Sequence, residues 1–348
     1  MKGRTGRTTR VKTVDPSLPG RHPGSRPSRS PAPRRRKSSV VSAQDVREAA
    51  ARLAGVAVRT PLRFVEPLHA YLKLESMQPM GAFKLRGAYN AISRLPQAAR
   101  RQGVITYSSG NHGQAVAYAA QLLGVRAVVV MPETAPAVKV AGVKKWGGEV
   151  VFAGRTSDER QRKAEEIAGR EGLAIVPPFD HPDIVAGQAT VGLEIAEQLP
   201  DARTVVVPVG GAGLIAGVVT GLAAAGSRAM VWGVEPSGAP KLKRSLEAGR
   251  PVRLDRTASL ADGLITLSVG AIPFAQLAAQ RDRLGGVVLV EDDALREAVL
   301  FLWRECRLTV EPSGAATTAA VRSGAIQPVP PTVLLVSGGN VDPSLLED

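Results

Sequence analysis

One stretch of the chain indicates its fold class most clearly: Thr204-Val-Val-Val-Pro-Val-Gly-Gly-Ala-Gly-Leu-Ile-Ala-Gly217. Its first six residues are apolar or β-branched, which predicts a strand buried on both faces, as in a parallel sheet. The glycines after it let the backbone approach a ligand closely, and the following residues have the composition of a packed helix. A strand, a glycine loop and a helix in this order are the unit from which α/β sheets are built.

The same alternation continues over the chain from about residue 40. Apolar β-branched runs predict strands, and Ala-rich periodic segments predict helices between most of them, which indicates parallel βαβ units. We therefore predict an α/β fold with doubly wound, mainly parallel sheets. The predicted strands are 71–75, 103–107, 127–131, 149–152, 174–176, 204–209, 230–234, 286–290 and 333–336, and the clearest predicted helices are 113–123, 158–171, 214–225 and 292–307.

The formal net charge of +14 is concentrated at the N-terminus. Residues 1–39 hold twelve Lys/Arg and one acid, Asp15, so this segment carries +11 and the remainder +3. Its Arg, Ser, Pro and Gly offer little apolar surface to bury, which predicts a disordered basic tail. A nucleic-acid-binding arm or an organelle transit peptide has a similar composition. We favour a solvated extension, and therefore expect no nucleic-acid partner for the folded part.

Cysteine content leaves the redox compartment open, with the cytoplasm as the default expectation, and hydropathy favours a protein without a membrane span. The single Cys306 excludes an intramolecular disulfide and is expected to be a small buried residue on the helix that contains 294–307. The run 204–227 has no charged residue, but its glycines and its proline fit a strand, a loop and a packed helix better than a membrane span.

A second motif places a lysine, Lys84, at the start of a predicted helix. It reads Lys73-Leu-Glu-Ser-Met-Gln-Pro-Met-Gly-Ala-Phe-Lys84-Leu-Arg-Gly-Ala88. The positive end of the helix dipole lowers the pKa of an ammonium group there. A lowered pKa is what an amine needs to form a Schiff base with an aldehyde cofactor. An isolated Phe-Lys pair would more simply be a solvated helix lysine.

A third motif, Tyr107-Ser-Ser-Gly-Asn-His-Gly113, precedes another helix. Hydroxyl, amide and backbone N–H groups at a helix N-terminus suit a carboxylate or a phosphate. The serines would serve equally as ordinary N-caps, and His112 alone would be a structural histidine. The glycine loop also has a rival interpretation, because Gly211-x-Gly213-x-x-Ala216 followed by Glu235 matches a dinucleotide-binding fingerprint.

Taken together, the motifs resemble the serine/threonine dehydratase family of fold-type II pyridoxal-phosphate enzymes, which includes serine racemase. The resemblance extends from about residue 40 to 340, whereas an NAD-binding protein would explain only the glycine loop. It implies a fold like that of tryptophan synthase β and a homodimer. It also implies a large cofactor-binding domain (40–102 plus 179–348) and a small domain (103–178). Further motifs in family order are Ala186-Gly-Gln188, Ala261-Asp-Gly263, Glu311-Pro and Ser337-Gly-Gly-Asn340.

The resemblance assigns roles to residues of these motifs. Lys84 would hold the cofactor aldehyde and then move the substrate's α-proton, and Ser109 matches the second acid/base of racemases. The implied cofactor-binding residues are Phe83, Lys84, Asn111, Gly210, Gly211, Ala212, Gly213, Leu214 and Ser337. The implied substrate-binding residues are Ser108, Ser109, Asn111, His112 and Gly113.

The implied activity is that of an ammonia-lyase that converts L-threonine or L-serine to a 2-keto acid and ammonia. Ser337, in place of an acid at the pyridine nitrogen, favours elimination over transamination. Alternatives are a serine racemase, or a dehydratase of 3-hydroxyaspartate or of a hydroxyectoine-derived amino acid. A catalytically silent ligand-binding protein is a further alternative, which the intact Lys84 and Ser109 disfavour.

The sequence departs from the family pattern in three places. Ala212 replaces a glycine of the phosphate loop, which is tolerable if its φ is negative. Lys241 stands where metal-binding members have a carboxylate, beside Glu235 and the carbonyl of Ala239, so we expect no divalent metal to be required. The Lys241 ammonium would then neutralise Glu235, or would point to solvent. Few residues follow Asn340, so no effector-binding domain is expected there.

Overall fold

The strand and helix on either side of the glycine loop form as the sequence predicts. The computed structural model describes residues 41–108, 110–135 and 137–346, and in it β7 (Thr204–Pro208) leads through the loop into α8 (Gly213–Ala224). Every residue of β7 is buried, because helices cover both faces of its sheet. The predicted tail, residues 1–39, lies outside the described residues.

β7 belongs to a six-stranded sheet with the order β1-β2-β10-β7-β8-β9. All neighbouring pairs are parallel except β1 with β2. The carboxyl ends of β2, β10 and β7 therefore meet along one edge, where open parallel sheets bind ligands. The other strands of this sheet are β1 (Leu62–Val65), β2 (Ala70–Leu74), β8 (Met230–Pro236), β9 (Leu284–Val290) and β10 (Thr332–Val336).

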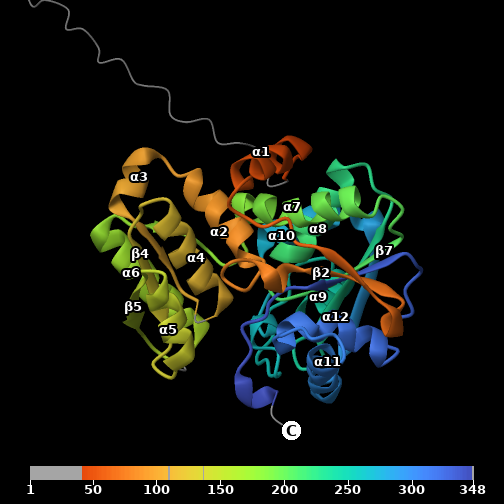
Figure 1. Ribbon diagram of the computed structural model, residues 1–348. Coiled ribbons are helices and arrows are strands. Elements are labelled where there is room, and N and C mark those ends of the chain that lie inside the picture. Colours follow the sequence, from red (N-terminus) through yellow and green to blue (C-terminus); the bar gives the residue numbers. More distant parts are fainter. Residues whose placement is uncertain (1–40, 109, 136, 347–348) are drawn as a thin grey trace, which may run out of the picture. The chain divides into compact units, whose positions relative to one another are not determined.

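Two layers of helices enclose this sheet (Figure 1). Val205 and Val207 of β7 pack into one cluster and Val206 packs into the other, because successive strand side chains point to opposite faces. The first cluster includes α1 (Ala43–Leu53), α7 (Pro182–Gln198), α8 and α10 (Ala271–Ala279), and the second includes α11 (Asp292–Arg304) and α12 (Pro312–Arg322).

A second, four-stranded sheet has the order β5-β4-β3-β6 and is parallel throughout. All of its strands fall between residues 103 and 178, the predicted small domain, but the domain boundaries stay a prediction because residues 38–348 form one compact unit. Its strands are β3 (Val104–Thr106), β4 (Ala127–Met131), β5 (Glu149–Phe152) and β6 (Ala174–Ile175), and α4 (Asn111–Leu122), α5 (Ala137–Lys145) and α6 (Ser157–Glu171) pack against them.

Two local features differ from the sequence-based expectation. The antiparallel edge strand β1 was not expected, and its central residues are exposed rather than buried. Helix α11 ends at Arg304, so Cys306 is buried in the turn beyond the helix rather than on it.

No helix within the described ranges is long and apolar enough to cross a membrane. The remaining helices are α2 (Lys84–Ser93), α3 (Gln97–Gln102) and α9 (Lys241–Ala248).

Candidate active site

Loops from three adjacent strands form the candidate site. They follow β2, β10 and β7, contain Ser337 and the glycines of residues 210–211, and lead to Lys84 at the start of α2 and Gly213 at the start of α8. The backbone N–H of Phe83 donates to the carbonyl oxygen of Ser337 (3.1 Å), and Ala82 forms a β-bridge with Gly338. The sheet therefore brings together motifs that lie about 250 residues apart in the sequence.

Lys84 is the first residue of α2, and its amine is held inside the protein. Its Nζ donates a hydrogen bond to the carbonyl oxygen of Pro178 (2.8 Å) and lies 5.2 Å from the centre of the Phe83 ring. Burial away from water lowers the pKa of this amine to about 8. A substantial fraction of Lys84 is consequently neutral and nucleophilic near neutral pH.

Helix α2 is fixed behind Lys84 by a buried network of charges. The guanidinium of Arg86, two residues further on, donates to both carboxylate oxygens of Glu75 (2.8 Å each) and to Glu194 (2.6 Å). Lys73 donates to Glu194 as well (2.5 Å). Because Arg86, Lys73 and Glu75 are almost fully buried, breaking one pair would leave an uncompensated charge in the core. This network orients the first turn of α2.

A short segment, Val176 to Phe179, links Lys84 to the other parts of the site. The carbonyl of Val176 lies 3.0 Å from Nε2 of His112, and that of Pro178 accepts from Lys84. The Phe179 ring packs on the glycine loop, since a Cβ added at Gly211 would lie 2.2 Å from it. No sequence motif marks this segment.

His112 is a neutral histidine in this environment. Burial, together with the nearby Lys84 ammonium, lowers the pKa of its imidazole to about 3. Nε2 must carry the proton in order to donate to the carbonyl of Val176, so Nδ1 is a free acceptor, and Nδ1 has no partner among the described residues. The structure thus brings His112 beside Lys84 as an uncharged group.

The glycine loop packs too tightly against its neighbours to carry side chains. A Cβ at Gly210 would lie 2.7 Å from the carbonyl oxygen of Gly263, so that position has no room for a side chain. Ala212 has φ +69°, a left-handed conformation, which contradicts the negative φ that we required for its methyl group. The conformation costs an alanine roughly 1–2 kcal/mol. The first N–H groups of α8 have no acceptor within the helix, and no side chain caps them, so they are available to an anion.

Asn111 is held by two residues from the far end of the sequence. Its Nδ2 donates to Oε1 of Glu311 (2.6 Å), and its Oδ1 accepts from Nδ2 of Asn340 (2.7 Å). Burial, together with the nearby negative charge of Asp262, raises the pKa of the Glu311 carboxyl to about 8. Ser337 is buried close by, with its Oγ 3.5 Å from the carbonyl oxygen of Ser313.

The serine loop folds back tightly on the first turn of α4. A Cβ at Gly113 would lie 2.4 Å from the carbonyl oxygen of Ser108, and Oγ of Ser108 accepts from the backbone N–H of Gly110 (3.4 Å). Ser109 lies outside the described residues, so its predicted roles in acid/base chemistry and substrate binding have no structural account here.

Glu235 is not available to bind a ribose. It is fully buried, its Oε1 accepts from Lys241 Nζ (3.0 Å) and its Oε2 accepts from the N–H of Lys243 (2.9 Å). The alternative in which Lys241 points to solvent is therefore wrong. The dinucleotide interpretation of the glycine loop loses the acid on which it depends.

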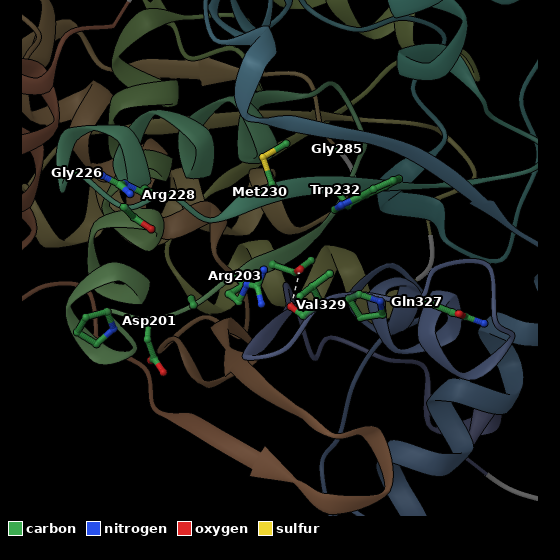
Figure 2. A pocket seen from close by; sticks show the side chains of 14 residues that line it. Asp201, Arg203, Gly226, Arg228, Met230, Trp232, Gly285, Gln327 and Val329 are labelled. Atoms are coloured by element: carbon green, nitrogen blue, oxygen red, sulfur yellow. Dashed lines mark hydrogen bonds between the residues drawn. The ribbon is translucent and has the colours of Figure 1, made fainter.

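A separate pocket of about 750 Å³ lies at the amino-terminal ends of β7 and β8, whereas the glycine loop follows the carboxyl end of β7 (Figure 2). Its lining includes Thr204 and Met230, the first residues of β7 and β8, with Arg203 and Arg228 at its exposed margin. The glycine loop leaves the other end of β7, so this pocket does not belong to the candidate active site.

The comparison with protein families agrees with this geometry. Residues 53–338 match the family described as pyridoxal-phosphate dependent enzyme. The chain belongs to this family. Like other pyridoxal-phosphate dependent enzymes, it has as cofactor an aldehyde that carries a phosphate. The residues present fit that cofactor, because they offer an amine of lowered pKa and, at the start of α8, a helix N-terminus that no side chain caps.

Individual members of the pyridoxal-phosphate dependent family are similar over most of their length. The L-threonine ammonia-lyase of Thermotoga maritima is 36% identical over 88% of this chain and 78% of that protein. The L-threo-3-hydroxyaspartate ammonia-lyase of a Pseudomonas species is 37% identical over 86% of this chain and 96% of that protein. The structure of maize serine racemase superposes with a TM-score of 0.82 at 34% identity and covers 88% of this chain and 96% of that one.

Proposed function

We propose that this enzyme is an ammonia-lyase that converts L-threonine or L-serine to a 2-keto acid and ammonia. One observation carries the proposal: the Lys84 amine is fixed by Pro178, has a pKa of about 8, and is joined by the adjacent Phe179 to the glycine loop. Its relatives include ammonia-lyases at 36–37% identity over most of their length.

Lys84 is proposed to bind the cofactor aldehyde and, once released, to act as the general base. The bound cofactor supplies an electron sink that makes the substrate's α-proton acidic. An amine whose pKa lies near the working pH both accepts and returns a proton efficiently. The carbonyl of Pro178 accepts from this amine and fixes its direction.

The other residues of the site are proposed to bind and orient. Amides from Gly210 to Leu214 would hold the cofactor phosphate at the start of α8. Asn111 would bond the ring hydroxyl, Phe83 would lie beside the ring, and Ser337 would meet the ring nitrogen. The substrate carboxylate would bind the serine loop, mainly through the hydroxyls and backbone N–H groups of Ser108, Ser109, Asn111, His112 and Gly113.

An ion pair near the site favours a substrate whose side chain is uncharged. Lys139 of α5 forms an ion pair with Asp262, and both act electrostatically on the buried carboxyl of Glu311, so the pair lies near the site. Because Asp262 neutralises Lys139, this cation is not free to bind a second substrate carboxylate. The arrangement favours serine or threonine over 3-hydroxyaspartate.

Product analysis with separate substrates tests the proposal. The purified enzyme, loaded with pyridoxal phosphate, is given L-threonine, L-serine and L-threo-3-hydroxyaspartate in turn, and 2-keto acid and ammonia are measured. We expect equal amounts of both products from threonine or serine, and none from a Lys84→Ala variant. D-serine as the main product from L-serine would instead establish a racemase, like the maize relative by its name.

The assembly and location of the enzyme also stay proposals. We infer a homodimer in the cytoplasm, with no nucleic acid or membrane bound by the folded part. Size measurement in solution tests the dimer. Salt-dependent DNA binding that disappears on deletion of residues 1–39 would contradict the view that the tail binds no nucleic acid.

A further inference from the structure

A fully buried lysine lies at the base of the glycine loop. The Nζ of Lys241 donates to Oε1 of Glu235 (3.0 Å), to the carbonyl oxygen of Ala239 (3.0 Å) and to that of Val209 (3.1 Å). These three acceptors use all three N–H groups of an ammonium. The side chains of Lys241 and Glu235 are both 0% exposed, so the charge is compensated entirely within the protein.

Stability alone does not explain this arrangement. A buried ion pair loses so much hydration that well-packed apolar residues of similar volume are often equally stable or more so. The carbonyl of Val209, one of the three acceptors, indicates instead that Lys241 positions the backbone. Val209 directly precedes Gly210, so its carbonyl fixes the point at which the chain leaves β7 and enters the loop. Glu235 is in turn held by the backbone N–H of Leu242 (2.8 Å).

The divalent metal site that the family resemblance implies does not fit this chain. Such a site would use Glu235, the carbonyl of Ala239 and a carboxylate at position 241. Here Lys241 contributes a positive charge in place of the third ligand, and it already bonds to the other two groups. A carboxylate and two carbonyls around one point form an acceptor set for a cation, and the Lys241 ammonium is that cation.

We propose that Lys241 is a built-in cation that positions the phosphate loop through Val209 and makes its shape independent of divalent metal. Lys241 is thus a positioning residue, and the inference rests on the proposed role of the loop in holding the cofactor phosphate. The enzyme is expected to keep its cofactor in the presence of a chelator, whereas removal of the Lys241 charge is expected to weaken cofactor binding.

Cofactor dissociation from the holoenzyme provides the test, with Lys243→Asp as the matched control. Lys243 lies on the same helix but pairs at the surface with Glu247, and only its backbone contacts Glu235. In the wild type and in Lys243→Asp, we expect neither EDTA nor Mg²⁺ to change the dissociation rate or the melting temperature. In Lys241→Asp, we expect release about 10-fold faster or more without metal, and substantial recovery with Mg²⁺.

A neutral double variant guards against loss of folding in Lys241→Asp. Lys241→Met with Glu235→Gln removes both charges together but leaves one of the backbone N–H groups of Leu242 and Lys243 without its acceptor, so we expect a folded protein whose melting temperature is only moderately below that of the wild type. Its affinity for pyridoxal phosphate should nevertheless fall about 10-fold, because Val209 loses its partner.

Wild-type enzyme that releases its cofactor in EDTA and regains it with Mg²⁺, or a double variant with unchanged affinity, would overturn the proposal. Failure of the proposed function would look different, as wild-type enzyme that binds no cofactor under any metal condition.

Discussion

Asn111 donates its side-chain amide hydrogen to Oε1 of Glu311 over 2.6 Å, which joins the start of α4 to the start of α12. The carboxyl group lies against Gly338, where a Cβ would be 2.1 Å from Oε1. Because burial raises the pKa of Glu311 to about 8, this carboxyl is protonated at neutral pH. A neutral acid holds Asn111 here without placing a negative charge beside the site.

The charge state of Glu311 predicts the effect of two substitutions. Glu311→Gln keeps an acceptor for Asn111 and resembles the protonated acid, so we expect kcat within a few-fold of the wild type at pH 7. Glu311→Ala leaves the amide of Asn111 without its partner, and we expect a loss of about 10-fold or more in cofactor affinity. Cofactor titrations and rates for both variants check this. A Gln variant as impaired as the Ala variant would show that the ionised carboxylate is needed.

The same carboxyl predicts how stability depends on pH. Its pKa in the folded protein, about 8, lies above its ordinary value of 4.5, so the folded state binds the extra proton between these values. The free energy of unfolding should therefore fall as pH rises through this window, by up to about 1.4 kcal/mol per pH unit from this group. Denaturant unfolding of the apoenzyme at several pH values should give a flatter dependence for Glu311→Gln. An unchanged dependence would refute the raised pKa.

The lowered pKa of Lys84 predicts the pH dependence of cofactor capture. Only the neutral amine attacks an aldehyde, and its fraction increases about tenfold per pH unit below the pKa. We expect the rate of covalent capture of pyridoxal phosphate by the apoenzyme to rise up to about pH 8 and then to level off. Stopped-flow absorbance measures this rate. A rate that continued to rise to about pH 10 would indicate an ordinary solvated lysine.

The left-handed backbone of Ala212 predicts that glycine is tolerated at this position and that valine is not. Glycine relieves strain of about 1–2 kcal/mol but loses a buried methyl and gains unfolded-state freedom, so we expect Ala212→Gly to change stability by less than about 1 kcal/mol. A β-branched residue is strained further in this conformation. Ala212→Val should therefore lose stability by about 2 kcal/mol or more and bind the cofactor more weakly. Equal tolerance of both residues in thermal unfolding and cofactor titration would contradict the positive φ.

The ion pair between Lys139 and Asp262 predicts a change of substrate preference. In Asp262→Asn, the Lys139 ammonium loses its ion-pair partner and keeps only the more distant charge of Asp342, so it becomes more available to a substrate with a second carboxylate. We expect kcat/KM for L-threo-3-hydroxyaspartate to rise relative to L-threonine by about 10-fold, and the double variant with Lys139→Met to lose this gain. An unchanged ratio in Asp262→Asn would show that the pair lies outside the substrate's reach.

Much of the fold was predictable because buried parallel strands have an unmistakable composition. β4, which is buried throughout, forms over the residues predicted for it, since helices cover its sheet and select apolar β-branched residues. β5 also forms over its predicted residues, although Glu149 and Phe152 at its ends are exposed at the edge of the sheet. The edge strand β1 lacks that signature, because Arg63 and Phe64 are exposed and its antiparallel pairing needs no buried run. Cys306 was misplaced because helical periodicity does not reveal where the final turn ends.

The site was predictable as a set of motifs but not as a set of contacts. Lys84, Asn111 and Ser337 could be named as candidates because each lies in a recognisable sequence motif. Glu311 was seen only as a motif, because its burial and raised pKa depend on residues distant in the sequence. Phe179 carries no motif, and its packing against the glycine loop became evident only from the structure.

Peptide mapping after chemical reduction shows which lysine carries the cofactor. The enzyme loaded with pyridoxal phosphate is treated with borohydride, which makes the bond between lysine and cofactor permanent, and is then digested and analysed by mass spectrometry. We predict that the cofactor mass is found on Lys84 and on no other lysine, and that the reduced enzyme releases no 2-keto acid. Modification of a different lysine, or full activity after Lys84 is blocked, would contradict the account.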